Sequence, residues 1–123
     1  DTGPYLIYCC ARIRSILRKW GKAVPRLSSE EFTVSSDWEW VLLKTLAVFP
    51  KVISDSMSQH NCSPLANYAL ELAHAFTSFY HECPVLNAQS DAILYSRLQL
   101  CNAALQTLSN ALGILGIETP ERM

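Results

Sequence analysis

The sequence lacks any run of about twenty consecutive apolar residues, the length that a membrane-spanning helix needs, so we expect no such helix. The first residues lack the basic and then apolar layout of a secretory signal peptide. There is also no acidic or basic block and no low-complexity tract, and charged residues make up only 17% of the chain. These absences exclude a disordered tail and predict a folded globular chain in the cytoplasm.

The cysteines lack the spacing of a disulfide framework or a zinc site. They number five, and they are Cys9, Cys10, Cys62, Cys83 and Cys101. The number is odd, two are adjacent, and no C-x-x-C pair occurs, whereas zinc ligands recur at short regular spacings. We expect small buried apolar side chains in a reducing compartment. A metal site that combines cysteines with His60, His74 or His81 is the less favoured alternative.

Half of the 123 residues are hydrophobic, which is enough for one domain with its own core. The sequence does not begin with Met, and we interpret residues 1–123 as a single domain that is a fragment of a longer protein. No alternating apolar pattern is long enough for a β-strand, and the apolar residues recur instead at helical spacing. The sequence therefore predicts an all-α bundle of about five helices.

Helix boundaries are indicated by prolines, glycines and capping residues. We expect helices over residues 4–20, 37–49, 50–58, 63–82 and 91–111, with a connection over residues 22–35. Ser36 to Glu39 is typical of a capping box, in which the serine and the glutamate each accept a backbone N–H at the start of a helix. Pro50 should kink or break the second helix, and Ser63-Pro64 should cap and start the fourth. Ser28 to Glu31 could cap one short turn within the connection.

Positive charge is concentrated at the beginning of the chain. Six of the ten cationic residues lie before residue 27, where Asp1 is the only acid. Residues 1–26 thus carry a formal charge of about +5 and the remainder about −6, although the net charge is −1. A solvated face of the first helix explains this pattern as well as a nucleic-acid surface does.

The first helix has three faces where an ordinary surface helix has two. Its core-facing residues, at about 100° per residue, are Leu6, Cys9, Ile13, Ile16, Leu17 and Trp20. Arg14 and Arg18 project roughly opposite. The third face, which we call the first-helix strip, consists of Tyr5, Tyr8, Arg12, Ser15 and Lys19. A boundary tyrosine ordinarily buries its ring and keeps its hydroxyl in water.

Aromatic rings beside cations also suit unpaired nucleotides. Bases stack on aromatic faces, while guanidinium and ammonium groups hold phosphates. Reading duplex DNA would require several polar side chains on a helix that enters a groove. The strip therefore favours single-stranded RNA in a loop, and no DNA partner is expected.

The same residues carry a resemblance to a known family. Four blocks match in order and spacing: DTGPYLIYCCARIRSILRKWG, DWEWVLLKTLAVFPKVI, LANYALELAHAFTSFYHECPVL and RLQLCNAALQTLSNALGILGIETPERM. Together they cover nearly all of the chain, and they resemble the C-terminal helical domain of arginyl-tRNA synthetases, class I enzymes. The specific features are the Tyr5-x-x-Tyr8-x-x-x-Arg12 spacing, the Phe79-Tyr80 pair and the ending at Met123. The DALR motif that names this domain is matched only in part by residues 91–94.

The resemblance implies an anticodon-binding domain that grips the anticodon loop of tRNA(Arg) and helps to read its central base, usually cytosine. It places Tyr5, Tyr8 and Tyr80 at the RNA surface and Met123 against a flipped-out base. Tyr80 and Met123 enter through the resemblance alone, and ordinary core packing of Tyr80 is the alternative.

No catalytic machinery is expected in this chain. The parent that it resembles uses ATP and Mg on a separate catalytic domain, and the signature motifs of that domain are absent here. His74 and His81 lie seven residues apart without a carboxylate or serine arranged for nucleophilic chemistry, so we interpret them as residues at the edge of the core. The alternative functions are a DALR-type interaction module in a non-synthetase protein and an enzyme with a cryptic site.

Overall fold

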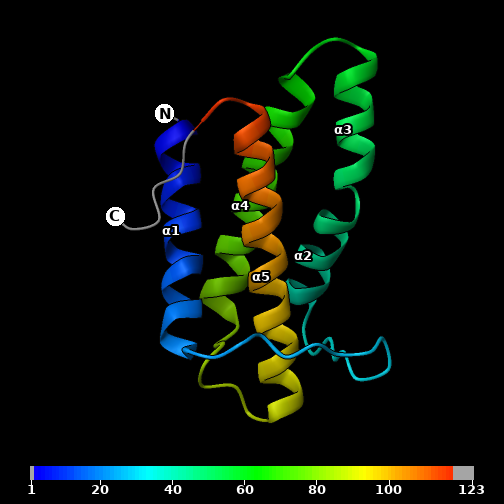
Figure 1. Ribbon diagram of the computed structural model, residues 1–123. Coiled ribbons are helices and arrows are strands. Elements are labelled where there is room, and N and C mark those ends of the chain that lie inside the picture. The colour runs from blue at the N-terminus through cyan, green and yellow to red at the C-terminus, as the bar shows by residue number, and fades with distance from the viewer. Residues whose placement is uncertain (1, 118–123) are drawn as a thin grey trace.

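The computed structural model describes residues 2–117, and this part of the chain is an all-α bundle of five helices without a strand. The helices are α1 (Thr2–Trp20), α2 (Asp37–Ala47), α3 (Phe49–Ser58), α4 (Ser63–Glu82) and α5 (Asp91–Ile114). Figure 1 shows α1, α4 and α5 as long helices side by side, with α2 and α3 on the opposite side from α1. The predicted fold class is confirmed.

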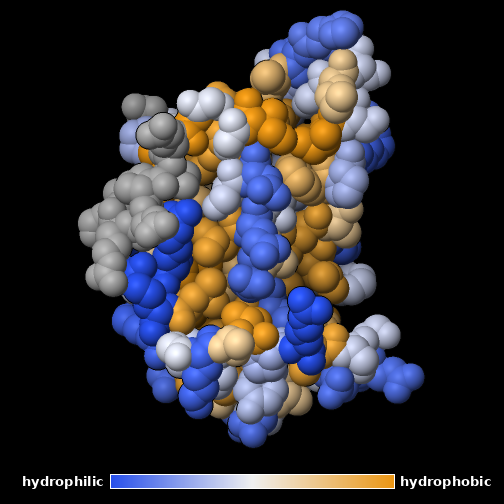
Figure 2. All heavy atoms as spheres, viewed as in Figure 1, coloured by the Kyte–Doolittle hydropathy of each residue, from blue (hydrophilic) through white to orange (hydrophobic). Residues whose placement is uncertain are grey.

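One contiguous core lies between α1, α2, α4 and α5. Its largest fully buried side chains include Phe76 and Phe79 on α4, Ile13 on α1, Leu42 on α2 and Leu98 on α5. Burying each of these side chains stabilises the folded state by roughly 1.5–3 kcal/mol. By contrast, α3 contributes no fully buried residue. In Figure 2 a polar stripe runs down the middle of the visible face, along α5, between more apolar bands.

Half of the predicted capping box at Ser36 is present. The Ser36 hydroxyl accepts the backbone N–H of Glu39 (3.4 Å), as predicted. The Glu39 carboxylate does not return to Ser36; it accepts the backbone N–H and the hydroxyl of Ser35, both at 2.7 Å. The reciprocal bond is shifted by one residue because the carboxylate also reaches Arg97 on α5 (Oε2 to Nε, 2.8 Å).

The break at Pro50 is confirmed, but the start of α4 differs from the prediction. Pro50 occupies the first turn of α3, where its missing N–H costs nothing. The residue that caps α4 is Cys62 and not Ser63, and it makes no side-chain capping bond. The N–H of Ser63 is instead satisfied by the side chain of Asn61 (3.0 Å).

The C-terminus of α5 lies beyond the predicted end at Ala111. The helix continues through Gly113 to Ile114, because it stops only where Gly116 adopts a φ of +79°. The N–H of Gly116 then bonds the carbonyl of Gly113 (3.1 Å), and that of Ile117 bonds Leu112 (2.8 Å). This pair of bonds is a Schellman motif, which favours glycine at the left-handed position.

The connection between α1 and α2 is held at two points. A reciprocal pair closes the Ser28 turn, in which the Ser28 N–H donates to the Glu31 carboxylate (2.9 Å) and the Glu31 N–H to the Ser28 hydroxyl (3.3 Å). Further along, the N–H of Thr33 donates to the buried hydroxyl of Ser96 on α5 (2.9 Å). The connection therefore packs along α5 before α2 begins.

The cysteines follow the prediction with one exception. Cys9, Cys10, Cys83 and Cys101 are buried, whereas Cys62 is exposed between α3 and α4. Burial raises the pKa of Cys9 and of Cys101 to about 12, and at Cys9 the neighbouring Cys10 adds to this effect.

Within residues 2–117, no cluster of three or more histidine, cysteine or carboxylate side chains could hold a metal. No helix in that stretch is long and apolar enough to cross a membrane.

Candidate nucleic-acid interface

Arg12 contacts both Tyr8 and Tyr80 where α1 meets the C-terminal part of α4. Tyr8 and Arg12 are one helical turn apart, so both side chains project from the same edge of α1. The guanidinium carbon of Arg12 lies 5.1 Å from the centre of the Tyr8 ring and 4.5 Å from that of Tyr80. Arg12 Nη2 also donates to the Tyr8 hydroxyl (3.1 Å). We call these three residues the tyrosine–arginine cluster.

Both tyrosines of the cluster remain accessible. Tyr8 is 53% exposed and Tyr80 is 37% exposed. Tyr80 is supported from within α4, because its ring stacks on buried Phe76 (centres 6.3 Å apart, 29° between planes) and meets the edge of His81 (5.5 Å). The Tyr80 ring is therefore held by Phe76, His81 and Arg12, and the remainder of the side chain is accessible.

Tyr5 is placed differently from Tyr8, although both belong to the first-helix strip. It is half-buried, and its hydroxyl contacts Thr77 Oγ1 (3.1 Å) and His74 Nδ1 (3.2 Å) on α4. Since the Thr77 hydroxyl donates to the carbonyl of Ala73, the Tyr5 hydroxyl donates to Thr77 and accepts from His74. The Tyr5 ring lies beside the His74 ring, with centres 5.2 Å apart. Tyr5 thus joins α1 to α4.

Lys19 is exposed at the other end of the strip. It lines a cavity of about 360 Å³ together with Ile16, Tyr80, His81 and the loop of residues 83–87. Tyr80 therefore contacts Arg12 and also forms part of this cavity.

His74 and His81 are exposed and make ring contacts with tyrosines, so the expectation that they lie at the core edge needs correction.

Arg12 and Lys19 form no ion pair with a carboxylate of the described residues. Within residues 2–117, the ion pairs are Lys51 with Asp55 and Arg97 with Glu39. Neither includes Arg12 or Lys19, so no carboxylate in that part of the chain neutralises them. Flat rings and fixed positive charge thus occur together, which is the combination that binds unstacked bases and their phosphates.

The sequence identified only part of this edge. Tyr8, Arg12 and Lys19 follow from helical spacing, and Tyr80 follows from the family resemblance; the structure brings Tyr80 onto Arg12. His81 and the 83–87 loop were not singled out, because nothing local shows that they meet α1. Met123 lies outside the described residues.

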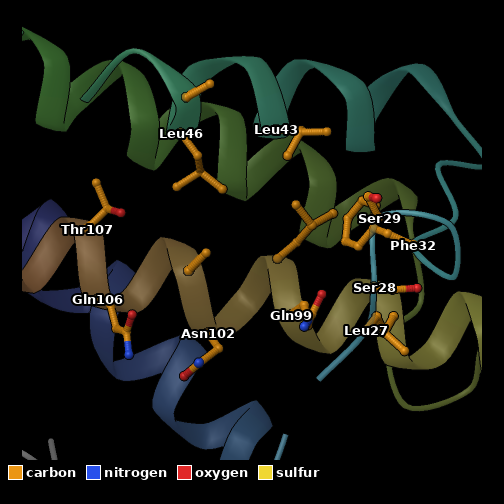
Figure 3. A pocket seen from close by; sticks show the side chains of 13 residues that line it. Leu27, Ser28, Ser29, Phe32, Leu43, Leu46, Gln99, Asn102, Gln106 and Thr107 are labelled. Atoms are coloured by element: carbon orange, nitrogen blue, oxygen red, sulfur yellow. The ribbon is translucent and has the colours of Figure 1, made fainter. Parts of the chain in front are cut away.

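The largest cavity among those described is elsewhere. It measures about 590 Å³ and lies between α2, α5 and the connection at residues 27–32. Figure 3 shows Leu43 and Leu46 of α2 facing Gln99, Asn102 and Gln106 of α5 across it. None of the described residues that line it is cationic, and it shares no residue with the tyrosine–arginine cluster.

Comparison with known proteins identifies the family. The model of the DALR anticodon binding domain family matches residues 6–123. The chain belongs to the DALR anticodon-binding domain family. An arginine–tRNA ligase of Maricaulis maris is 38% identical over 99% of this chain and 20% of the ligase, and one of Halobacterium salinarum is 40% identical over the whole chain and 19% of the ligase.

Solved structures agree with this assignment of the DALR domain. The arginyl-tRNA synthetase of Thermus thermophilus superimposes with a TM-score of 0.87 at 34% identity, over all of this chain and 21% of that one. The Plasmodium falciparum enzyme superimposes with a TM-score of 0.84 at 32% identity, over 97% of this chain and 21% of that one. The resemblance inferred from the sequence blocks is confirmed. The chain spans about a fifth of the length of the relatives it matches.

Proposed function

We propose that this DALR domain binds the anticodon loop of tRNA(Arg) as one domain of an arginine–tRNA ligase. The observation that carries the proposal is the tyrosine–arginine cluster, in which two accessible rings flank a guanidinium that no described carboxylate neutralises. In this proposal, residues 1–123 form a single domain, and the ATP- and magnesium-dependent chemistry belongs to a catalytic domain elsewhere in the parent protein.

Each residue of the edge has a proposed role that its position supports. Tyr8, which is the most exposed ring of the cluster, stacks on an unstacked base. Arg12 and Lys19 contact phosphates, and Tyr80 provides a second ring that the core holds in place. Tyr5 contributes through the edge of its ring, since its hydroxyl is engaged with α4. Met123 remains a proposed contact on the strength of the family resemblance.

The alternative of an interaction module in a non-synthetase protein has less support. The relatives described above are arginine–tRNA ligases, and each matches nearly the whole of this chain. The composition of the cluster does not decide between the two alternatives, because tyrosine and arginine are also enriched in protein–protein interfaces. The preference for RNA therefore rests on the relatives.

A fluorescence anisotropy titration with labelled RNA tests the proposal. The ligand is the anticodon stem-loop of an arginine tRNA, and the control is the same stem with a loop of equal length in which only the central anticodon base is changed. We expect binding at low salt that weakens for the control RNA. Absence of binding would refute RNA recognition, and equal affinity for both RNAs would refute reading of the central base.

A further inference from the structure

We propose that the cavity bounded by Lys19, Tyr80, His81 and Asn87 is a subsite for one unstacked nucleobase, separate from the one that stacks on Tyr8. This inference rests on the proposed function, because it assigns a second contact to the same RNA loop. The cavity lies between α1, the end of α4 and the loop of residues 83–87.

The size and lining of the cavity suit a base. Its volume of about 360 Å³ is at the small end of the range for ligand pockets, roughly 300–1,000 Å³. Ile16, Val85 and Leu86 provide apolar walls, and Tyr80 provides a ring. The Asn87 side chain adds an amide, which carries a donor and an acceptor side by side and can pair with the polar edge of a base.

Charge and continuity favour RNA as the occupant. Lys19 lines the cavity, and no carboxylate side chain among residues 2–117 does. Tyr80 contributes to the cavity while its ring also carries the Arg12 guanidinium. An RNA chain that stacks one base on Tyr8 would therefore pass Arg12 and reach the cavity along the same edge of α1. Lys19 would contact the phosphate of the nucleotide whose base enters the cavity.

The loop that closes the cavity is anchored to the core. Arg97 Nη1 donates to the carbonyl of Pro84 (2.6 Å), and the same guanidinium is held by Glu39 (2.8 Å). Cys83 is buried, and its sulfur contacts the Ser36 hydroxyl (3.3 Å). A turn then follows, in which the N–H of Ala88 bonds Val85 (3.3 Å). The cavity is thus preorganised, which lowers the entropic cost of binding.

The loop offers a matched pair of variants. Asn87 and Gln89 are both exposed amides on the same segment, but only Asn87 lines the cavity. We expect Asn87→Ala to weaken binding of the anticodon stem-loop by roughly three- to ten-fold, the scale of a lost hydrogen bond. Gln89→Ala should bind like the unmodified chain. Melting curves of both variants should be unchanged, since neither side chain is part of the core.

The two subsites are separated by repeating the titrations with stem-loops in which one loop nucleotide at a time is abasic. We expect that a stem-loop with an abasic nucleotide at one loop position binds Asn87→Ala and the unmodified chain equally well. A different abasic position should abolish the loss of affinity caused by Tyr8→Ala. If Asn87→Ala binds normally while Tyr8→Ala is weakened, the subsite is refuted and the proposed function stands. The subsite is also refuted if one position removes both penalties. If neither variant is weakened, both proposals fail.

Discussion

The buried ion pair between Glu39 and Arg97 makes the strongest prediction about stability. The Glu39 side chain is fully buried and that of Arg97 is 11% exposed. Replacing Arg97 with Met removes its bonds to Glu39, Pro84 and Ser35 and leaves Glu39 Oε2 without its partner. Removing one partner of a buried pair costs about 3–5 kcal/mol. We expect a loss of about 3 kcal/mol, because Glu39 Oε1 keeps both bonds from Ser35.

The pH dependence of stability should reverse in this variant. Burial alone would raise the pKa of Glu39, but hydrogen bonds from Arg97 and Ser35 outweigh it and hold the pKa below 4.5. A lowered folded pKa means that the stabilisation is present above pH 4.5 and is lost as the pH falls through the folded pKa. In Arg97→Met burial should dominate and raise the pKa of Glu39, so that its contribution is greatest below pH 4.5 and is lost as the pH rises.

Urea unfolding followed by circular dichroism at several pH values between 3 and 7 measures both effects. The control is the double variant Glu39→Gln/Arg97→Met, which should be less destabilised than the sum of the two single variants because the buried charge is gone. A loss below about 1 kcal/mol for Arg97→Met, with an unchanged pH slope, would refute the reasoning. It would show that water reaches Glu39 when Arg97 is absent.

Three further predictions concern the helix edge and the thiols. Lys19→Ala should reduce the steepness of the plot of log K for stem-loop binding against log salt concentration by about one unit, whereas Lys44→Ala on α2 should leave it unchanged. A slope equal to that of the unmodified chain would exclude a phosphate contact at Lys19. Tyr5→Phe should cost about 0.5–1.5 kcal/mol of stability in urea unfolding through its lost hydrogen bonds and leave stem-loop affinity unchanged; weaker binding would show that its hydroxyl contacts RNA. At pH 8 a thiol reagent should modify one cysteine rapidly, Cys62, and Cys62→Ser should abolish this phase; a remaining fast phase would contradict the burial of the other four.

The sequence predicts the elements of this fold better than it predicts their contacts. Ser36 and Pro50 mark helix starts because capping and the missing proline N–H act within one turn. Both Gly113 and Gly116 are candidates for the end of the last helix, but Gly113 lies within α5 and, of these two glycines, only Gly116 takes a positive φ. Local rules thus determine where α2 and α3 begin, while the end of α5 depends on where the left-handed residue falls.

Long-range partners account for what the sequence could not predict. The spacing of Tyr8 and Arg12 places them on one edge of α1, but the position of Tyr80 above Arg12 depends on how α4 packs against α1. The same packing turns the Tyr5 hydroxyl toward His74, although Tyr5 and Tyr8 looked equivalent in the sequence. Likewise, the capping box at Glu39 gives no indication of Arg97, which lies 58 residues away.

The affinity of Tyr8→Ala for the anticodon stem-loop tests the central claim most directly. Because Tyr8 is 53% exposed, its removal should leave the melting curve nearly unchanged while it deletes a stacking surface. We predict a loss of about 1–3 kcal/mol in binding free energy, which is roughly a 5- to 150-fold rise in Kd. A folded variant with the Kd of the unmodified chain would contradict an RNA surface at the tyrosine–arginine cluster.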